Sequence, residues 1–265
     1  MNIIAIDIGN TNIGVGLFLG DEEKSIESIP GKSRAKLTER LKSAWEQIPA
    51  AQSSIEGKRD GVIVVSSVKP AWTKLVEEIV KDELGESPLI IGKDIPLPIT
   101  CWIDEPDKVG TDRVVAAAAA YDVVGDAVIV VDCGTAVTID LVDERGVFKG
   151  GVICPGFEIS AKALKDNTAQ LPKVEISKPA GPYGRNTTEA INCGIYYSAV
   201  GAIQEIIRRY AEELGKWPQT VITGSAAKVI ADDCSFIDNY VPHLVVNGIV
   251  LAYKKYIEEE AADSF

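Results

Sequence analysis

The chain has 265 residues, of which 46% are hydrophobic and 25% are charged. This length fits one large or two small domains, and the composition is that of a folded globular protein rather than a disordered one. There are 39 acidic and 27 basic side chains, so the net charge is -12 at pH 7 with the single histidine neutral. Such an acidic chain repels phosphate backbones and anionic bilayers, so we expect no nucleic acid and no membrane as partners.

The cysteines and the histidine narrow the class of protein further. Five cysteines are scattered along the chain with no C-x-x-C pair and no Cys/His cluster, which argues against a disulfide framework and a structural zinc site. The amino-terminal segment has neither the basic flank nor the apolar length of a signal peptide. These features predict a cytoplasmic protein. With one histidine available, an enzyme built from this chain is expected to use carboxylates as its acid and base groups.

In chain order, the first predicted element is a β-hairpin over residues 3–18, where two apolar runs flank an Asp-x-Gly and a small polar turn. Amphipathic periodicity predicts a helix over 35–48, followed by a short buried strand over 61–66. A helix over 70–84 begins at a proline, and a further strand is expected at 88–91. Strands and helices therefore alternate in this half of the chain.

The second half continues the alternation. Its predicted elements are an alanine-rich helix over 111–124, strands over 127–132, 136–142 and 147–153, a long helix over 188–214, a strand over 220–223 and a terminal helix over 247–260. This order predicts an α/β fold whose sheets are covered by helices.

An internal repeat links the two halves. Residues 128–142 repeat the plan of residues 3–18, and Asp132-Cys133-Gly134 stands 125 residues after Asp7-Ile8-Gly9. Backbone N–H groups in a glycine-containing turn can wrap phosphate oxygens, and a carboxylate at the strand end can hold a divalent cation or its water. Each loop alone is also compatible with an ordinary hairpin turn, but two facing phosphate loops explain the repetition. We therefore predict two similar domains.

A second candidate site lies at residues 110–113, Gly-Thr-Asp-Arg. Thr111 can cap the alanine-rich helix, so the segment places free N–H groups and a guanidinium at a helix N-terminus, where an anion is favoured. Asp112 is positioned there to accept a proton from a hydroxyl as a phosphoryl group arrives. The alternative role of Asp112 is to complement the helix dipole and pair with an arginine.

Six short motifs carry a family resemblance when taken together. They are DIGNTN at 7–12, GTDR at 110–113, DCGTAVTID at 132–140, GGVICPG at 150–156, GRNT at 184–187 and TGSA at 223–226. In this order, and over nearly the whole chain, they resemble the type III pantothenate kinases. The resemblance implies two duplicated actin/ribonuclease-H-like domains with mixed sheets flanked by helices, over residues 1–113 and 114–265. It also implies a homodimer that uses ATP to phosphorylate pantothenate to 4'-phosphopantothenate, the first step of coenzyme A biosynthesis.

The resemblance further implies roles for individual residues. ATP-binding residues are Asp7, Ile8, Gly9, Asn10, Thr11, Asn12, Ile13 and Gly14 in the first phosphate loop and Thr135 in the second. Pantothenate-binding residues are Ile103, Gly110, Thr111, Asp112, Arg113 and Thr187, with Asp112 as the catalytic general base. Asp132 corresponds to the site of a monovalent cation, K⁺ or NH₄⁺, and Asp7 faces the Mg²⁺ of the bound Mg-ATP.

Two positions depart from the family pattern, and two alternative functions stay open. Ile103 stands where many relatives have an aromatic residue, so we expect no side-chain hydrogen bond to substrate there. Ser225 replaces a glycine of the late glycine-rich turn but is small enough for close approach to a nucleotide. The alternatives are a kinase of the same fold with another small-molecule acceptor and a non-catalytic ATP-binding accessory or regulatory protein. The three aspartates with Thr135 argue against a non-catalytic role.

Overall fold

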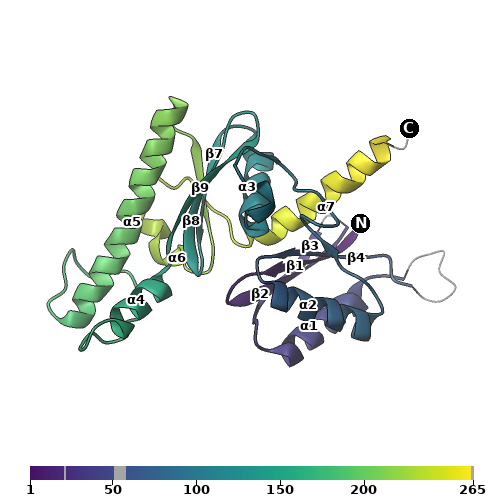
Figure 1. Cartoon of the computed structure of the whole chain (residues 1–265), viewed down its shortest axis with the longest axis horizontal. Helices are drawn as coiled ribbons and strands as arrows, with labels where there is room; N and C mark the ends of the chain where they lie inside the picture. The colour runs from purple at the N-terminus through teal and green to yellow at the C-terminus, as the bar shows by residue number, and fades with distance from the viewer. Residues whose placement is uncertain (21, 51–57, 264–265) are drawn as a thin grey trace. The chain divides into compact units, whose positions relative to one another are not determined.

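The computed structural model describes residues 1–20, 22–50 and 58–263. The chain folds into two compact units, and Figure 1 shows the sheet and helices of each. The first unit comprises Met1–Thr100, Asp104–Ala119 and Val245–Phe265, and the second comprises Cys101–Ile103 and Ala120–Leu244. Each unit therefore draws on more than one segment of the chain.

The strands of the first unit lie in the order β3-β2-β1-β4-β5. They are β1 (Asn2–Ile8), β2 (Asn12–Leu19), β3 (Glu22–Pro30), β4 (Val62–Ser67) and β5 (Leu89–Ile90). The first three form an antiparallel meander, whereas β4 pairs in parallel with β1, and β5 with β4. β1 and β4 are rich in Ile and Val, whose branched side chains suit a buried, pleated surface.

One face of this sheet packs against α1 (Arg34–Gln47) and α2 (Pro70–Ile79). Because side chains alternate along a strand, the isoleucines at positions 4, 6 and 8 of β1 all enter this core, where they are fully buried. Helix α2 continues as a π-helical turn over Val80–Leu84 and ends at Gly85 in the left-handed conformation. The helix expected over 70–84 is therefore α-helical as far as Ile79 and π-helical from Val80 to Leu84.

The C-terminal helix α7 (Leu244–Asp263) also packs in the first unit, against α3 (Thr111–Val124) and the opposite face of the sheet. A Cβ placed on Gly248 would lie 2.1 Å from the Val115 carbonyl oxygen, so the two helices approach as closely as glycine allows. A Cβ on Gly16 of β2 would lie 2.6 Å from Cγ1 of Val246. These contacts explain why the first unit includes α7, whereas the expected boundary at residues 113 and 114 falls inside α3.

The strands of the second sheet lie in the order β11-β10-β7-β8-β9-β6. They are β6 (Thr100–Cys101), β7 (Val128–Cys133), β8 (Ala136–Val142), β9 (Val147–Pro155), β10 (Gln219–Thr223) and β11 (Asn239–Tyr240). Again three consecutive strands, β7 to β9, form an antiparallel meander, and β10 pairs in parallel with the first of them.

Helices α4 (Phe157–Asp166), α5 (Thr187–Leu214) and α6 (Ala227–Ile230) belong to this second unit. Ile129 and Val131 of β7 point into a core that also contains Tyr196 and Ile203 of α5. Val128 and Val130 point to the other face by strand alternation and are also buried. The strand is therefore apolar on both faces up to its end, where Asp132 follows.

The two units share a topology, which confirms the expected α/β fold of duplicated halves with mixed sheets flanked by helices. In each unit an antiparallel meander comes first in the chain, and a later strand adds in parallel to its first strand. The principal predicted helices and strands all form, with ends shifted by a few residues. The sequence pattern predicts neither β3, whose sequence EEKSIESIP lacks a regular apolar alternation, nor α4.

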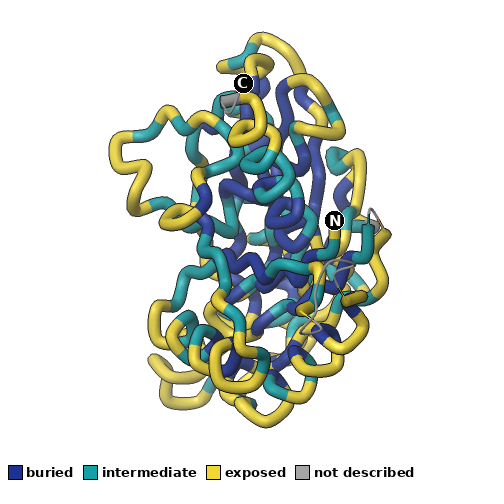
Figure 2. Tube along the Cα trace, turned by 90° about the vertical axis from the view of Figure 1, so that its right-hand side faces the viewer, coloured by how far each residue is buried: buried dark blue, intermediate teal, exposed yellow. Residues whose placement is uncertain are grey.

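Burial follows this architecture. In Figure 2 the buried residues concentrate in the inner parts of the chain trace, and the outlying turns are largely exposed. Among the described helices, none combines the length and apolar character that crossing a lipid bilayer requires.

The α3–α7 contact yields a stability prediction. We expect Gly248→Ala to lower the free energy of unfolding by about 1–3 kcal/mol, because the added methyl overlaps the Val115 carbonyl of the neighbouring helix. Gly201→Ala in α5 is the matched control, since a Cβ there meets nothing within 4 Å, and alanine should stabilise the helix by about 0.5–1 kcal/mol. Chemical denaturation measures both, and equal effects of the two substitutions would contradict the packing argument.

Candidate active site

The first phosphate loop is the turn between β1 and β2. Ile8 pairs with Ile13, and the N–H of Gly9 donates to the Asn12 carbonyl at 3.1 Å, which closes the turn. Asn10, Thr11 and Asn12 are exposed at its tip. The predicted ATP-binding residues therefore divide into an exposed tip and the flanking strand ends, where Ile8 and Ile13 are buried core residues.

Asp7 lies at the carboxyl end of β1, on the sheet face opposite α1 and α2. Strand alternation assigns this face, because Ile6 and Ile8 on either side of Asp7 enter the α1–α2 core. In register with Asp7 are Gly14 on β2 and Ser66 on β4. The carboxylate therefore stands between a glycine and a serine, at the edge where two parallel strands end.

Thr111 connects this edge to the start of α3. Its hydroxyl oxygen lies 2.8 Å from the Ser66 hydroxyl and accepts the Ser67 N–H at 3.2 Å. The two hydrogen bonds fix Thr111, the first residue of α3, to the end of β4. Thr111 and Ser67 are 44 residues apart in the sequence. The Gly-Thr-Asp-Arg segment and Asp7 therefore belong to the same end of the same sheet.

Asp112 follows in the first turn of α3. Its Oδ1 accepts the Arg113 N–H at 2.8 Å, and a Cβ at Gly110 would lie only 2.5 Å from the same oxygen. Burial raises the pKa of Asp112 above its ordinary value, and the backbone N–H and guanidinium of Arg113 oppose that shift. A carboxylate with a raised pKa and an adjacent cation is suited to act as a general base.

The second phosphate loop is the turn between β7 and β8. The N–H of Gly134 donates to the Ala136 carbonyl at 2.9 Å, and Thr135 is exposed. Cys133 pairs with Val137, so this turn is one residue shorter than the first, where Ile8 pairs with Ile13. The duplication thus preserves the strand-end aspartate and the glycine but not the length of the loop.

Asp132 has a glycine as its close neighbour. It is in register with Thr223 of β10, and a Cβ on the next residue, Gly224, would lie 2.3 Å from its Oδ1. Gly224 has a φ of +99°, which L side chains rarely adopt, so both backbone conformation and space require glycine. Ala226 in the same turn donates its N–H to the Cys133 carbonyl at 2.9 Å. The TGSA turn is therefore fastened against the second phosphate loop.

The Pro-Gly motif at the end of β9 lies close to the backbone of the same loop. A Cβ at Gly156 would lie 2.4 Å from the Thr135 carbonyl oxygen and 2.7 Å from that of Gly134. Gly156 also precedes α4, which the sequence pattern does not predict. Gly156 therefore lies against the carbonyl side of the second phosphate loop, where a larger residue would not fit.

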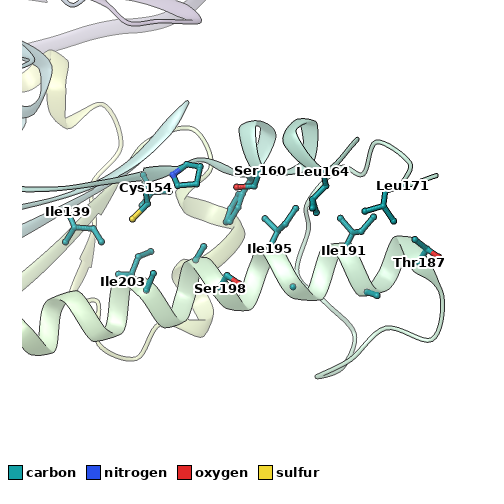
Figure 3. A pocket seen from close by; sticks show the side chains of 17 residues that line it. Ile139, Cys154, Ser160, Leu164, Leu171, Thr187, Ile191, Ile195, Ser198 and Ile203 are labelled. Atoms are coloured by element: carbon teal, nitrogen blue, oxygen red, sulfur yellow. The ribbon is translucent and has the colours of Figure 1, made fainter. Parts of the chain in front are cut away.

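Thr187 is the first residue of α5. Asn186 caps the helix by accepting the Glu189 N–H at 2.9 Å, and a Glu189 carboxylate oxygen accepts the N–H of Arg185, the residue before the N-cap, at 2.7 Å. Thr187 contributes to the lining of an apolar groove between α5, α4 and the sheet, at the opposite end from Ile139 (Figure 3). The groove has a volume of about 650 Å³, and neither Asp132 nor Thr135 lines it.

Ile103 is half-buried in the second unit, where its Cγ2 would be 3.4 Å from a Cβ on Gly150. Its neighbour Trp102 is 71% exposed, and the Lys149 ammonium lies 3.2 Å from the centroid of its ring. The two side chains thus have different surroundings, and the apolar Ile103 offers a substrate no hydrogen bond.

The structure adds functional candidates that the motifs did not reveal. Ser66 and Ser67 anchor α3, Gly224 makes room for Asp132, and the Lys69 ammonium donates to the Asn10 carbonyl in the first phosphate loop. The sequence signal for Ser66 and Ser67 is limited to their position at the end of the buried run VIVVSS. No local pattern identifies Lys69, because its partner is 59 residues away.

The described residues contain no cluster of three or more His, Cys, Asp or Glu side chains suited to hold a metal ion. Asp7 and Asp132 instead offer single carboxylates, each beside a phosphate loop. Oxygen ligands of this kind suit Mg²⁺ and K⁺ when nucleotide oxygens and water complete the coordination.

The family model and the curated relatives agree on one family. The family model of the type III pantothenate kinases matches residues 3–209. A type III pantothenate kinase of Brevibacillus brevis is 36% identical over 256 residues, covering 96% of this chain and 98% of the relative. One from Moorella thermoacetica is 34% identical over 253 residues, covering 96% and 99%.

Among solved structures, a protein of Campylobacter jejuni described as a conserved member of the Baf family of transcriptional activators superposes with a TM-score of 0.59. It is 19% identical and covers 99% of this chain, with 100% of its own length matched, and so supports the fold alone. The family model and the curated relatives extend over the strands and loops that carry the candidate site. The chain belongs to the type III pantothenate kinase family.

Proposed function

We propose that this protein transfers the γ-phosphoryl group of ATP to the primary hydroxyl of pantothenate, giving 4'-phosphopantothenate at the start of coenzyme A biosynthesis. The observation that carries the proposal is the attachment of Thr111 to the end of β4, which brings Asp112 to the sheet edge that also bears Asp7. Membership in the family supports the choice of acceptor.

The two Asp-x-Gly turns are proposed to bind ATP. In the first, the tip residues 10–12 contribute backbone N–H groups, and in the second Thr135 contributes its N–H and hydroxyl. Such groups stabilise phosphate oxygens without requiring a cationic side chain. This choice matters in a chain with a net charge of -12, because phosphate binding must depend on local donors.

Asp112 is proposed as the general base. It accepts the proton of the pantothenate hydroxyl while that oxygen attacks the γ-phosphorus and ADP leaves. Burial supports this role by raising the pKa of the carboxyl, which makes its ionised form a better proton acceptor. Gly110, Thr111 and Arg113, with Ile103 and Thr187, are proposed to contact pantothenate.

Cations complete the proposal. Gly224 lets the Asp132 carboxylate lie close against the backbone of the TGSA turn, because a Cβ there would be 2.3 Å from Oδ1. This single carboxylate is the proposed ligand of a weakly bound K⁺ or NH₄⁺ ion. Asp7, at the end of β1, is proposed to face the Mg²⁺ of Mg-ATP. Bound cations offset the negative charge of the phosphates during transfer.

We further propose a homodimer in the cytoplasm. The groove lined by α5, α4 and the sheet is largely apolar, with exposed side chains along α5, and a second copy of the chain is its proposed occupant. Thr187 is in the lining, so the dimer would place a pantothenate-binding residue at the interface. All five cysteines are free thiols, which fits a reducing compartment.

Turnover tests the reaction and its cation requirement. We expect purified protein to form ADP from ATP when pantothenate is present and not with glucose or acetate, and to do so faster with K⁺ than with Na⁺. Asp132→Asn should reduce the difference between the two cations, because it removes the proposed carboxylate ligand. If no pantothenate-dependent ADP forms with K⁺ or with Na⁺, the proposed reaction is refuted.

Asp112 is tested separately from nucleotide binding. We expect Asp112→Asn to lower kcat by at least ~100-fold, the lower range for a general base, while calorimetry finds ATP binding retained. Asp82→Asn, which changes an exposed acid of the same unit, is the control and should keep full activity. A kcat near that of the wild type in Asp112→Asn would assign the proton to another acceptor.

The dimer is tested through the groove. Ser198 is an exposed residue of the groove lining, so Ser198→Arg should insert a charge into the proposed interface and shift sedimentation from dimer to monomer. Ser43→Arg, at an exposed position on α1, is the matched control and should leave the dimer intact. An unchanged dimer in Ser198→Arg would place the interface elsewhere.

A further inference from the structure

Lys69 brings a cationic side chain to the first phosphate loop from a distant part of the chain. It immediately precedes Pro70, the first residue of α2, and its Nζ donates to the Asn10 carbonyl at 2.9 Å. The same ammonium lies 3.3 Å from the centroid of the Trp72 ring. A cation held on one side by a ring face and on another by a carbonyl has a defined position.

The base of this lysine is also fixed. Its backbone N–H donates to the Ser67 hydroxyl at 3.1 Å, and its carbonyl accepts from the Trp72 N–H at 2.9 Å. The Trp72 ring is packed so tightly on Gly31 that a Cβ there would lie 1.9 Å from ring carbons. Lys69 is therefore anchored at both ends rather than free to sample many rotamers.

The carbonyl groups of the three residues at the tip of the first phosphate loop, 10–12, each receive a donor from the protein. Asn10 receives the Lys69 ammonium, Thr11 the Gly31 N–H at 3.2 Å, and Asn12 the Gly9 N–H at 3.1 Å. The N–H of the following residue points opposite to a carbonyl across a trans peptide, and the described chain has no cis peptide. Fixing the Asn10 carbonyl therefore also fixes the direction of the Thr11 N–H.

We propose that Lys69 is a positioning residue for nucleotide binding, which holds the Asn10 carbonyl so that the Thr11 N–H faces the ATP phosphates. This inference rests on the proposed assignment of the 7–14 loop to ATP. Of the three donors that fix the loop's tip, Lys69 alone is a side chain and carries a charge. Its charge also lies beside the loop in a chain whose overall field repels phosphate.

The experiment compares Lys69→Met with Lys69→Arg, and uses Lys74→Met, at an exposed lysine in α2, as the control. We expect Lys69→Met to raise the KM for ATP and the calorimetric Kd for ATP by about tenfold, the effect of losing one charge-assisted hydrogen bond. The KM for pantothenate should stay within about twofold. Lys69→Arg should restore most of the ATP affinity, because it keeps the donor and the contact with Trp72.

A purely structural role predicts a different pattern. It would lower the melting temperature and affect both substrates alike, with no rescue by arginine, and either that pattern or an unchanged ATP affinity in Lys69→Met would overturn the proposal. Because calorimetry with ATP requires no acceptor, the effect on Kd is measured even if pantothenate is not the substrate. Failure of the proposed reaction is thus distinguished from failure of the Lys69 assignment.

Discussion

The candidate site depends on the hydrogen bond between the hydroxyls of Ser66 and Thr111. A neutral hydrogen bond of this kind contributes only about 1 kcal/mol to stability, yet this one joins the start of α3 to the end of β4. Asp112 and Arg113 follow directly on the helix, so their positions depend on that attachment. Because Ser66 is in register with Asp7, the same bond relates the proposed base to the proposed nucleotide loop.

Glycines supply the second constraint on the site. Gly110 gives the Asp112 carboxylate room to turn toward the Arg113 N–H, and Gly224 does the same for the carboxylate of Asp132. Gly156 lets a backbone segment approach the carbonyls of the second phosphate loop. In each case the lack of a side chain lets an oxygen atom lie close to the glycine, which explains why glycine recurs in the motifs.

The acidic character of the chain gives the local donors their importance. A net charge of -12 opposes the binding of a polyphosphate, so the proposed ATP site depends on local donors such as the backbone N–H groups of the two turns. Arg113 stands beside Asp112, where it also limits the rise of the pKa that burial causes. The Arg113 guanidinium is thus a local positive charge at the candidate site of a chain whose net charge is negative.

Much of the fold was predictable from sequence, because apolar periodicity, glycine and proline act locally. The repeated Asp-x-Gly hairpins predicted the duplicated architecture. The motifs singled out Asp7, Asp112 and Asp132, whose roles stay a prediction. Sequence could not predict the polar edge strand β3, which is stabilised by pairing with β2 rather than by its own pattern. Nor could it assign α7 to the first unit, reveal Gly224 beside Asp132, or bring Lys69 to Asn10. These are contacts between residues far apart in the chain, and only the packing of strands and helices decides which distant groups meet.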